Sequence, residues 1–314
     1  MTATDRMGRR RSPDDRTGVV VIDKPAGMTS HDVVARVRRI VGQARVGHTG
    51  TLDPAATGVL VLCLGRATRL VRFLQAGTKT YAARMVLGIA TDTQDADGAE
   101  VSRVDASHVD ERSLCAALTT FRGAITQTPP MVSAVKVDGE RLHVRARRGE
   151  TVEREDRTVT VHDLVLDEFV AGTHPQASFL VSCSAGTYVR TLAHDVGERL
   201  GVGGSLLALR RVANGAFTLD DCYTLDALDA MATAGRLDAA IVSIEDAVER
   251  TMPVVEITDI AVARRLASGG RADAFGQDGV YALRFGTDLV GIYRDDEGMA
   301  RAELVWSDPE RFRA

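Results

Sequence analysis

The residues best suited to chemistry gather in one short segment, RVGHTGTLDPAATGVLVLCLG at positions 45–65. Pro54 biases Asp53 toward an extended backbone, so its carboxylate is held at a turn. A carboxylate there could attack carbon or accept a proton. The same local pattern also suits an Asx turn or a helix cap at Asp53, and at His48 a turn histidine bonded to a neighbouring carbonyl. The segment alone leaves these interpretations open.

This segment must be positioned by a helix before it and a strand after it. Thr29 or Ser30 can cap a helix with one apolar face, and the apolar runs 19–22 and 59–64 are typical of buried strands. A polar loop at 47–58 lies between helix and second strand, and a helix over 67–75 and a strand over 81–87 are expected to follow. The apolar positions of the first helix are Val33, Val34, Val37, Ile40 and Val41.

The rest of the chain continues to mix helices and strands, which predicts an α+β fold. Further helices are expected over 107–121, 187–200 and 225–234, and further strands over 158–170, 179–183 and 206–212. After Pro253 the pattern changes to short strands with glycine-rich turns, over 280–285, 289–293 and 302–306. We therefore predict a disordered basic lead (1–17), a main domain (18–252) and a small β-rich module (253–314).

Composition excludes several classes of protein. The 314 residues are 45% hydrophobic and 26% charged, as in ordinary globular proteins. No run approaches the ~20 apolar residues of a membrane helix, and the first residues lack the apolar core of a secretory signal. The cysteines are widely spaced, which argues against a disulfide framework or a zinc site and favours the cytoplasm. They are Cys63, Cys115, Cys183 and Cys222.

The net charge of -4 conceals an uneven distribution. Residues 1–72 hold 13 basic and 6 acidic side chains, whereas residues 161–252 hold 6 and 13. A basic region of this kind can attract a polyanion locally whatever the total charge. Only three basic residues are lysine, namely Lys24, Lys79 and Lys136. In so arginine-rich a chain, these lysines are expected at positions where arginine would not serve.

Five segments together carry a family resemblance. GHTGTLDPAATGVL resembles the signature loop of the TruB family of bacterial tRNA pseudouridine synthases. DKPAGMTSHDVV at 23–34 and KTYAARMVLGIATDTQDADG at 79–98 are similar to further family motifs. So are TQTPPMVSAVKVDGERL at 126–142 and SAGTYVRTLAHDVGERLG at 184–201. The matches follow the family's order and cover roughly residues 18–215.

The resemblance implies an isomerase that breaks the N1–C1′ bond of a uridine and rejoins the base through C5. The family's target is uridine 55 in the T-loop of tRNA, reached by flipping the base out of its stack. No cofactor and no metal are expected, because no group is lost and no electrons leave. The expected fold is the pseudouridine synthase fold, a mixed or antiparallel sheet flanked by helices, with a PUA-like module in the tail.

The resemblance also assigns roles to individual residues. Asp53 matches the catalytic aspartate, as nucleophile or as base, and Arg190 matches the arginine that pairs with it. Such a pair is expected to hold the pKa of the aspartate low. Tyr81 matches the tyrosine that stacks on the target base. His48 matches a histidine that enters the T-loop where the flipped nucleotide had been.

Further residues are expected to bind substrate or RNA. Lys24 would support the floor of the site or a nearby phosphate, and Leu209 would form an apolar wall. Residues from about 127 to 157 resemble an RNA-gripping insertion, in which His143 stands where the family often has tyrosine. The tail would grip the acceptor-stem side of tRNA or merely cap the main domain. The basic residues of the insertion are Lys136, Arg141, Arg145, Arg147 and Arg148.

Two other functions fit the same residues. One is a non-catalytic protein that binds or folds RNA on this scaffold. The other is a synthase of the same fold acting on ribosomal RNA or within a guide-RNA complex. The length and the complete insertion favour a stand-alone enzyme that acts on tRNA. We expect it to act as a monomer and without an obligate protein partner.

Overall fold

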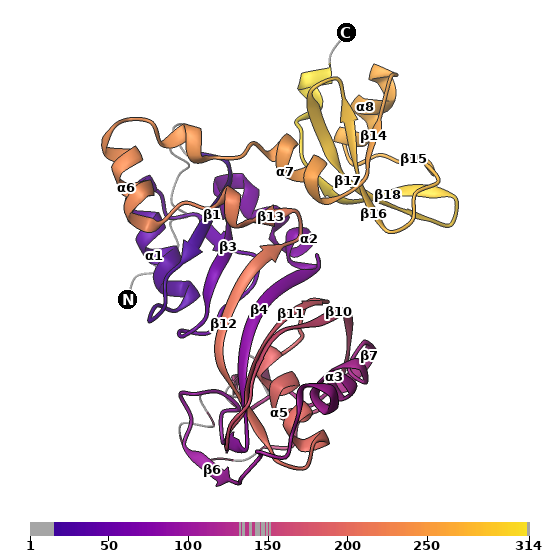
Figure 1. Ribbon diagram of the computed structural model, residues 1–314. Coiled ribbons are helices and arrows are strands. Elements are labelled where there is room, and N and C mark those ends of the chain that lie inside the picture. The colour runs from indigo at the N-terminus through magenta and orange to yellow at the C-terminus, as the bar shows by residue number, and fades with distance from the viewer. Residues whose placement is uncertain are drawn as a thin grey trace, which may run out of the picture.

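The computed structural model describes residues 16–131, 133, 136–137, 140–141, 145, 148, 150 and 152–312. Its centre is a nine-stranded sheet. The strands of this sheet are β1 (Gly18–Lys24), β2 (Val46–His48), β3 (Thr57–Leu64), β4 (Lys79–Leu87), β7 (Gly123–Gln127), β10 (Arg157–Val170), β11 (Gln176–Cys183), β12 (Gly204–Asn214) and β13 (Phe217–Thr218). They lie in the order β1-β3-β12-β4-β11-β10-β7, with β2 beside β3 and β13 beside β12 (Figure 1). Among the described strands of this sheet, only β3 and β12 pair in parallel, so the sheet is mixed and the predicted α+β class is confirmed.

Helices flank this sheet, and several begin at a polar cap. Thr29 caps the first helix, with its side chain accepting from the Asp32 amide and the Asp32 carboxylate accepting from the Thr29 amide. The α-helices are α1 (Ser30–Val41), α2 (Val71–Gln75), α3 (Glu111–Thr119), α5 (Val189–Arg199), α6 (Leu225–Thr233), α7 (Ile244–Thr251) and α8 (Ile260–Ala267). The 3₁₀ turns are η1 (Gly65–Leu70), η2 (Leu219–Asp221), η3 (Leu237–Ala240) and η4 (Pro309–Phe312).

The β1–β3 half of the sheet is covered on both faces. Val20 and Ile22 belong to the same core cluster as residues of α1 and α6. Val19 and Val21 point the other way, into a cluster that contains residues of α7. A strand with two buried faces needs no alternation of apolar and polar residues, which explains the continuous apolar runs at 19–22 and 59–64.

The β4–β11–β10 half is covered on one face only. Tyr81, Ala83 and Met85 point into a core shared with α3 and α5, whereas Ala82 and Arg84 between them are exposed. This period of two is the pattern of a strand with one open face. The half of the sheet beside the Asp53 segment therefore offers an uncovered surface.

Several predicted elements differ from the observed ones. The helix expected over 107–121 is α3, and it begins only after Asp110, whose carboxylate caps it through the amide of Ser113. The helix expected over 67–75 is divided into η1 and α2. A two-stranded sheet of β5 (Ile89–Thr91) and β6 (Glu100–Arg103) was not predicted, because its short strands lack a clear period.

The tail forms its own five-stranded sheet in the order β14-β16-β17-β18-β15, with α8 beside it (Figure 1). Its core is not separate from the rest of the chain. Ile292, Leu304 and Trp306 share one apolar cluster with Val61 and Leu70. The tail strands are β14 (Val254–Glu256), β15 (Ala272–Asp273), β16 (Val280–Phe285), β17 (Asp288–Asp296) and β18 (Met299–Val305).

The N-terminal segment is placed from Arg16 onward. The Arg16 amide donates to Oε1 of Gln43, and Gln43 Nε2 donates back to the Arg16 carbonyl, each at 2.9 Å. The main domain therefore holds Arg16, and the predicted disordered lead over 1–17 is wrong for its last two residues, Arg16 and Thr17, which the structure places. Residues 1–15 lie outside the described residues. In the described part of the chain, no helix combines the length and the apolar character of a membrane span.

We expect Trp306→Ala to lower the free energy of unfolding by about 3–5 kcal/mol, because it empties a large buried site in the shared core. Trp306 is 8% exposed, and the Arg66 guanidinium carbon lies 4.7 Å from its ring centre. Urea unfolding measures the change. Val170→Ala, at a residue 52% exposed, serves as control and should change stability by at most about 0.5 kcal/mol. A cost below about 1 kcal/mol for Trp306→Ala would contradict a shared core.

Candidate functional site

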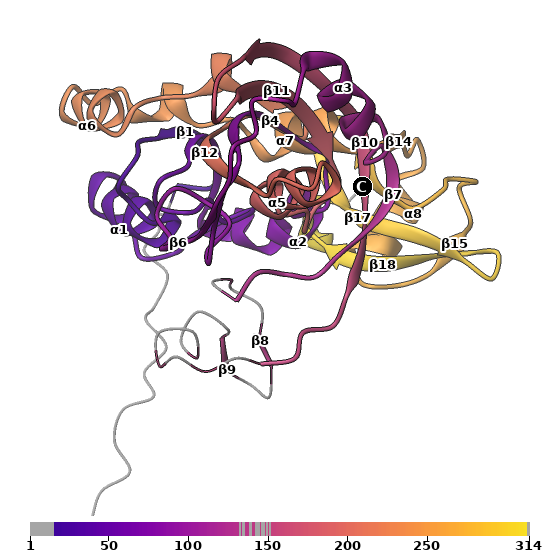
Figure 2. The same ribbon diagram turned by 60° about the horizontal axis from the view of Figure 1, so that its bottom comes forward.

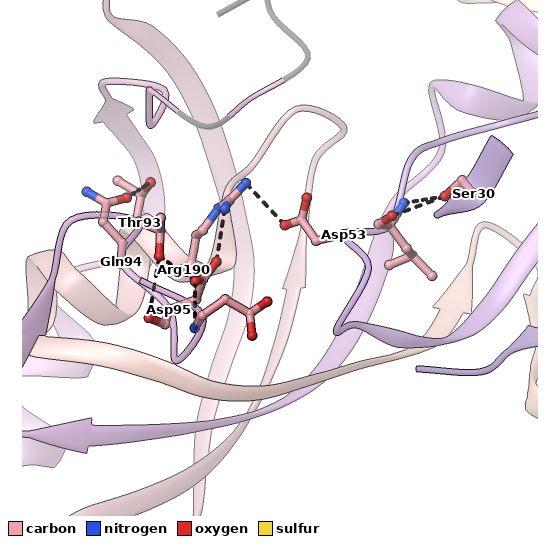
Figure 3. A network of polar contacts seen from close by, with 9 residues as sticks. Ser30, Asp53, Thr93, Gln94, Asp95 and Arg190 are labelled. Atoms are coloured by element: carbon pink, nitrogen blue, oxygen red, sulfur yellow. Dashed lines mark hydrogen bonds and ion pairs between the residues drawn. The ribbon is translucent and has the colours of Figure 1, made fainter. Parts of the chain in front are cut away.

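Asp53 lies in an irregular loop, residues 49–56, which joins β2 to β3 and is here called the Asp53 loop. Side chains from other elements hold much of its backbone, beside a few backbone bonds such as that from the Thr49 amide to the Val61 carbonyl. Ser30, the first residue of α1, accepts from the Leu52 amide at 2.9 Å and donates to the Leu52 carbonyl at 3.2 Å (Figure 3). This pair of bonds fixes the residue immediately before Asp53.

Lys24 holds the other side of the same loop. Its side chain is completely buried, and its ammonium donates to the carbonyls of Pro25, Pro54 and Ala56 at 2.9, 3.1 and 2.7 Å. Burial lowers the pKa of Lys24 to about 8, with the nearby Asp53 carboxylate acting in the opposite direction. All three ammonium hydrogens are thus donated to backbone carbonyls. Lys24 therefore supports the backbone that follows Asp53.

Lys79 is buried in a similar way. Its ammonium donates to the carbonyls of Gln75 and Gly77, each at 2.6 Å, at the end of α2. A compact ammonium can direct its hydrogens to carbonyls that converge on one point, whereas the planar guanidinium of arginine spreads its donors in a rigid fork. This geometry accounts for lysine at positions 24 and 79 in an arginine-rich chain.

Arg190 lies between two carboxylates (Figure 3). Its Nη2 is 3.2 Å from Oδ2 of Asp53 and its Nη1 is 3.0 Å from Oδ2 of Asp95. The Arg190 side chain is 6% exposed and stands in the first turn of α5. Because the guanidinium is planar and rigid, it fixes the two carboxylates relative to each other. The predicted pairing of Arg190 with Asp53 is present in the structure, but the arginine is shared.

The second carboxylate was not among the residues singled out from the sequence. Asp95 belongs to the segment TDTQDADG at 91–98, and its Oδ1 accepts from the Thr93 hydroxyl at 2.5 Å and from the Asp97 amide at 3.2 Å. Thr191, the neighbour of Arg190, donates to Gln94 Oε1 at 2.7 Å. The available signal in the sequence was three aspartates in a short polar loop after the tyrosine strand, but the arginine that Asp95 contacts is remote in sequence.

The pKa of Asp53 is raised above its ordinary value, contrary to our expectation. Removal of water from around the carboxylate is the largest cause, and the charges of Asp95 and Asp97 add to it. Arg190 and Lys24 favour the ionised form but do not outweigh these effects. The expectation failed because the sequence shows neither the second carboxylate on Arg190 nor the desolvation.

Asp53 opens onto a pocket of about 240 Å³ that is also lined by Tyr81, Leu209 and Arg190. Tyr81 and Leu209 reach it from neighbouring strands, β4 and β12, on the same face of the sheet. A volume of this size suits one nucleoside rather than a run of bases. Leu209 is half-buried against the core, so it can form an apolar wall.

A larger hollow of about 690 Å³ adjoins the first and shares Asp53, Leu206 and Leu209 with it. It lies on the open face of the sheet and is lined by Ala82, Arg84 and Leu180, among others. Neither Tyr81 nor Arg190 borders it. The smaller pocket therefore holds the groups that can do chemistry, and the larger one is an open surface beside them.

His48 stands at the end of β2, just before the Asp53 loop. Its Nδ1 accepts from the Gly50 amide at 3.3 Å, and its ring meets that of His31 edge to face at 5.4 Å. Burial lowers the pKa of His48, and the neighbouring His31 and Arg211 act in the same direction. A neutral imidazole with its hydrogen on Nε2 is thus favoured.

The predicted RNA-gripping insertion follows β7. Its start is tied to the site, because Gln127 Nε2 donates to the Tyr188 carbonyl at 3.2 Å and the Tyr188 amide donates to Gln127 Oε1 at 3.0 Å. Tyr188 directly precedes α5, which carries Arg190. The base of the insertion is therefore fixed next to the pocket.

The insertion lies only in part within the described residues, among them β8 (Lys136–Val137) and β9 (Glu140–Arg141), which Figure 2 labels. Arg145 is half-buried, and Arg148 is exposed with its Nε 2.7 Å from a Glu150 carboxylate oxygen. Lys136 and Arg141 occupy paired positions in a short hairpin of β8 (Lys136–Val137) and β9 (Glu140–Arg141). Predicted features outside the described residues are Arg147, His143 and the side chains of Lys136 and Arg141.

Together these groups can perform carboxylate chemistry on one bound nucleoside. Asp53 supplies a carboxylate at the pocket, Arg190 orients it and Tyr81 supplies an aromatic surface. Within the described ranges, no three His, Cys, Asp or Glu side chains are grouped as ligands for one metal ion.

We expect Asp95→Asn to lower the pKa of Asp53. The substitution removes a negative charge that raises this pKa and leaves Arg190 to Asp53 alone, and both changes favour the carboxylate. The titration of the side-chain carboxyl ¹³C resonance measures the pKa, with Asp53→Asn used to assign the signal. Asp288→Asn, in an exposed ion pair with Arg311 in the tail, should leave the midpoint unchanged. An unchanged or higher midpoint in Asp95→Asn would contradict the shared arginine.

Comparison with known proteins agrees with the resemblance. Residues 38–189 match the family model described as TruB family pseudouridylate synthase (N terminal domain), and residues 190–249 match tRNA pseudouridylate synthase B C-terminal domain. The chain is 47% identical over 297 residues to tRNA pseudouridine synthase B of Thermobifida fusca, covering 92% of this chain and 98% of that one. It is 50% identical over 230 residues to the Geobacter sulfurreducens protein of the same name, covering 73% and 75%.

Solved structures show the same relationship at greater distance. A Cbf5-Nop10-Gar1 complex contains a chain with 28% identity and a TM-score of 0.72, covering 97% of this chain and 93% of that one. An H/ACA RNP bound to a substrate RNA containing 2'-deoxyuridine contains one with 26% identity and a TM-score of 0.70, covering 93% and 86%. With its sequence, fold and site in agreement, the chain belongs to the TruB family of pseudouridylate synthases.

Proposed function

We propose that the protein isomerises uridine to pseudouridine at position 55 in the T-loop of tRNA. The observation that carries the proposal is the carboxylate of Asp53, oriented by Arg190 at a pocket for one nucleoside. Membership of the family supports the isomerisation as the reaction, and the relatives named tRNA pseudouridine synthase B support tRNA as the substrate.

The target uridine is expected to leave the base stack and enter the pocket against Tyr81. Stacking on an aromatic ring contributes roughly 1–3 kcal/mol per base, which offsets part of the cost of flipping. Asp53 then acts at the ribose, by attack on carbon or by removal of a proton, and the N1–C1′ bond breaks. The base turns within the pocket and C5 bonds to C1′, while the Asp53–C1′ bond breaks or the proton that Asp53 removed returns to the ribose. C5 then loses its hydrogen to solvent as a proton, and N1 takes up a proton. Arg190 keeps the carboxylate aimed at the same place throughout.

The remaining assignments concern the rest of the RNA. His48 would fill the place of the flipped nucleotide, and the basic insertion and front of the chain would bind phosphates without reading sequence. We divide the chain into a catalytic domain, 18–252, and a PUA-like RNA-binding module, 253–314, although the two share a core. We also propose that the protein acts as a monomer in the cytoplasm.

We expect the protein to release one tritium per tRNA from unmodified tRNA labelled at uracil C5. Asp53→Asn should abolish the release, because an amide is neither a nucleophile nor a base of useful strength, and should leave the Kd for tRNA within about twofold. Filter binding and tritium counting on the same preparations measure both quantities.

The control substrate is tRNA with the T-loop uridine replaced by cytidine, which should release none above background. Continued release from this tRNA would exclude position 55 as the target. Full activity of Asp53→Asn would exclude the assigned carboxylate, and an inactive wild-type protein would overturn the proposed function itself.

A further inference from the structure

Arg211, on β12 beside the site, is buried in an unusual way. Its side chain is completely buried, and its Nε and Nη2 donate to the carbonyls of Val59 at 2.7 Å and Gly50 at 3.2 Å. Its Nη1 has no hydrogen-bond partner among the described residues. Among the described residues, no carboxylate lies within ion-pair distance of Arg211, whereas Arg190 and Arg210 each have a carboxylate partner.

Stability alone gives no reason for this residue. A buried charge without a partner of opposite sign carries a desolvation cost of several kcal/mol, and an apolar side chain of similar volume would avoid it. Groups retained at such a cost are common at functional sites. The contacts of Arg211 indicate what it does there.

The two carbonyls that Arg211 holds lie on either side of Asp53. Gly50 is near the start of the Asp53 loop, and Val59 follows its end. The backbone of Arg211 is in direct contact with the same region, because a Cβ at Gly58 would lie 2.2 Å from the Arg211 carbonyl oxygen. Gly58 has a φ of +99°, which also favours glycine. The Arg211 side chain thus connects the two ends of the segment that carries the Asp53 carboxylate.

Arg211 is also the cross-strand neighbour of Tyr81. The two residues are directly paired between β12 and β4, and both border the 240 Å³ pocket with Asp53. A Cβ added to Gly50 would lie 3.6 Å from Nη1 of Arg211 and 3.9 Å from Cε of Lys79. Nη1 therefore lies on the side of the pocket formed by Gly50 and Lys79.

We propose that Arg211 is a positioning residue for the isomerisation: it ties both ends of the Asp53 loop to β12 and so holds the Asp53 carboxylate in register with the Tyr81 ring. The proposal rests on the proposed function. The buried charge of Arg211 also acts on the pKa of Tyr81, because Arg211 and Tyr81 are cross-strand neighbours on the same face of the sheet. Burial raises the pKa of Tyr81 most, Cys183 on β11 and Asp53 also raise it, and Arg211 lowers it.

The test uses Arg211→Met and Arg211→Lys in the full chain, with single-turnover tritium release from tRNA. Arg211→Met should lower the rate by about 10–100-fold, because a misplacement of about 1 Å at a reacting group can cost 10²-fold. The Kd for tRNA should stay within about twofold. Arg211→Lys should give an intermediate rate, because an ammonium keeps the charge but lacks the separate Nε and Nη2 donors that hold the two carbonyls.

A second readout separates positioning from mere folding. The ¹³Cζ resonance of Tyr81, assigned with Tyr81→Phe, should titrate at higher pH in Arg211→Met and close to the wild-type pH in Arg211→Lys. Arg122→Met is the matched control, because Arg122 also donates to a carbonyl, that of Leu164, but lies away from the site. It should change neither the rate nor the Tyr81 titration.

Two results would overturn the inference. One is a rate for folded Arg211→Met within about twofold of wild type, and the other is a rate loss that matches the loss of folded protein with no change in the Tyr81 titration. If Arg211→Met does not fold, Arg211→Lys decides, and a wild-type rate there overturns the inference. Failure of the wild-type protein to release tritium would instead count against the proposed function.

Discussion

The structure depends on one constraint, namely that an irregular loop must hold the Asp53 carboxylate at the pocket although the loop itself forms no regular strand. Buried backbone carbonyls need donors. For the Asp53 loop the donors include side chains from three different elements, Ser30 of α1, Lys24 of β1 and Arg211 of β12. The mixed sheet brings these elements together, because β12 pairs with β3 in parallel at the point where the loop ends. The order of the strands is therefore tied directly to the position of Asp53.

The charges of the site follow from the same arrangement. Lys24, Lys79 and Arg211 are buried on backbone carbonyls, whereas Arg190 is shared between Asp53 and Asp95. Asp53 is thus partly desolvated and only partly compensated, which raises its pKa and makes its ionisation sensitive to neighbours. A carboxylate of this kind is a stronger base than an exposed aspartate. The uneven charge along the chain thus includes cations that face inward as well as those available to RNA.

The tail is part of this framework rather than an appendage. The tail contributes Leu304 and Trp306 to the core that supports β1 and β3, and Arg66 of η1 lies over the Trp306 ring. β1 carries Lys24, and β3 follows the Asp53 loop. The tail and the strands next to the Asp53 loop therefore share one packed core.

The sequence by itself determined the local features of this protein. Periodicity predicted β10, α6 and the buried strands β1 and β3, and motif order predicted the family and the pairing of Arg190 with Asp53. It did not indicate that Asp95 shares that arginine, because the two residues are 95 positions apart. Nor could it separate Arg210 from Arg211, which are identical in type and adjacent. Arg210 points to one face and pairs with Asp23, whereas Arg211 points to the other and is buried. Only the tertiary structure decides this, because side chains alternate along a strand and the register of β12 against β4 sets which of them faces the site.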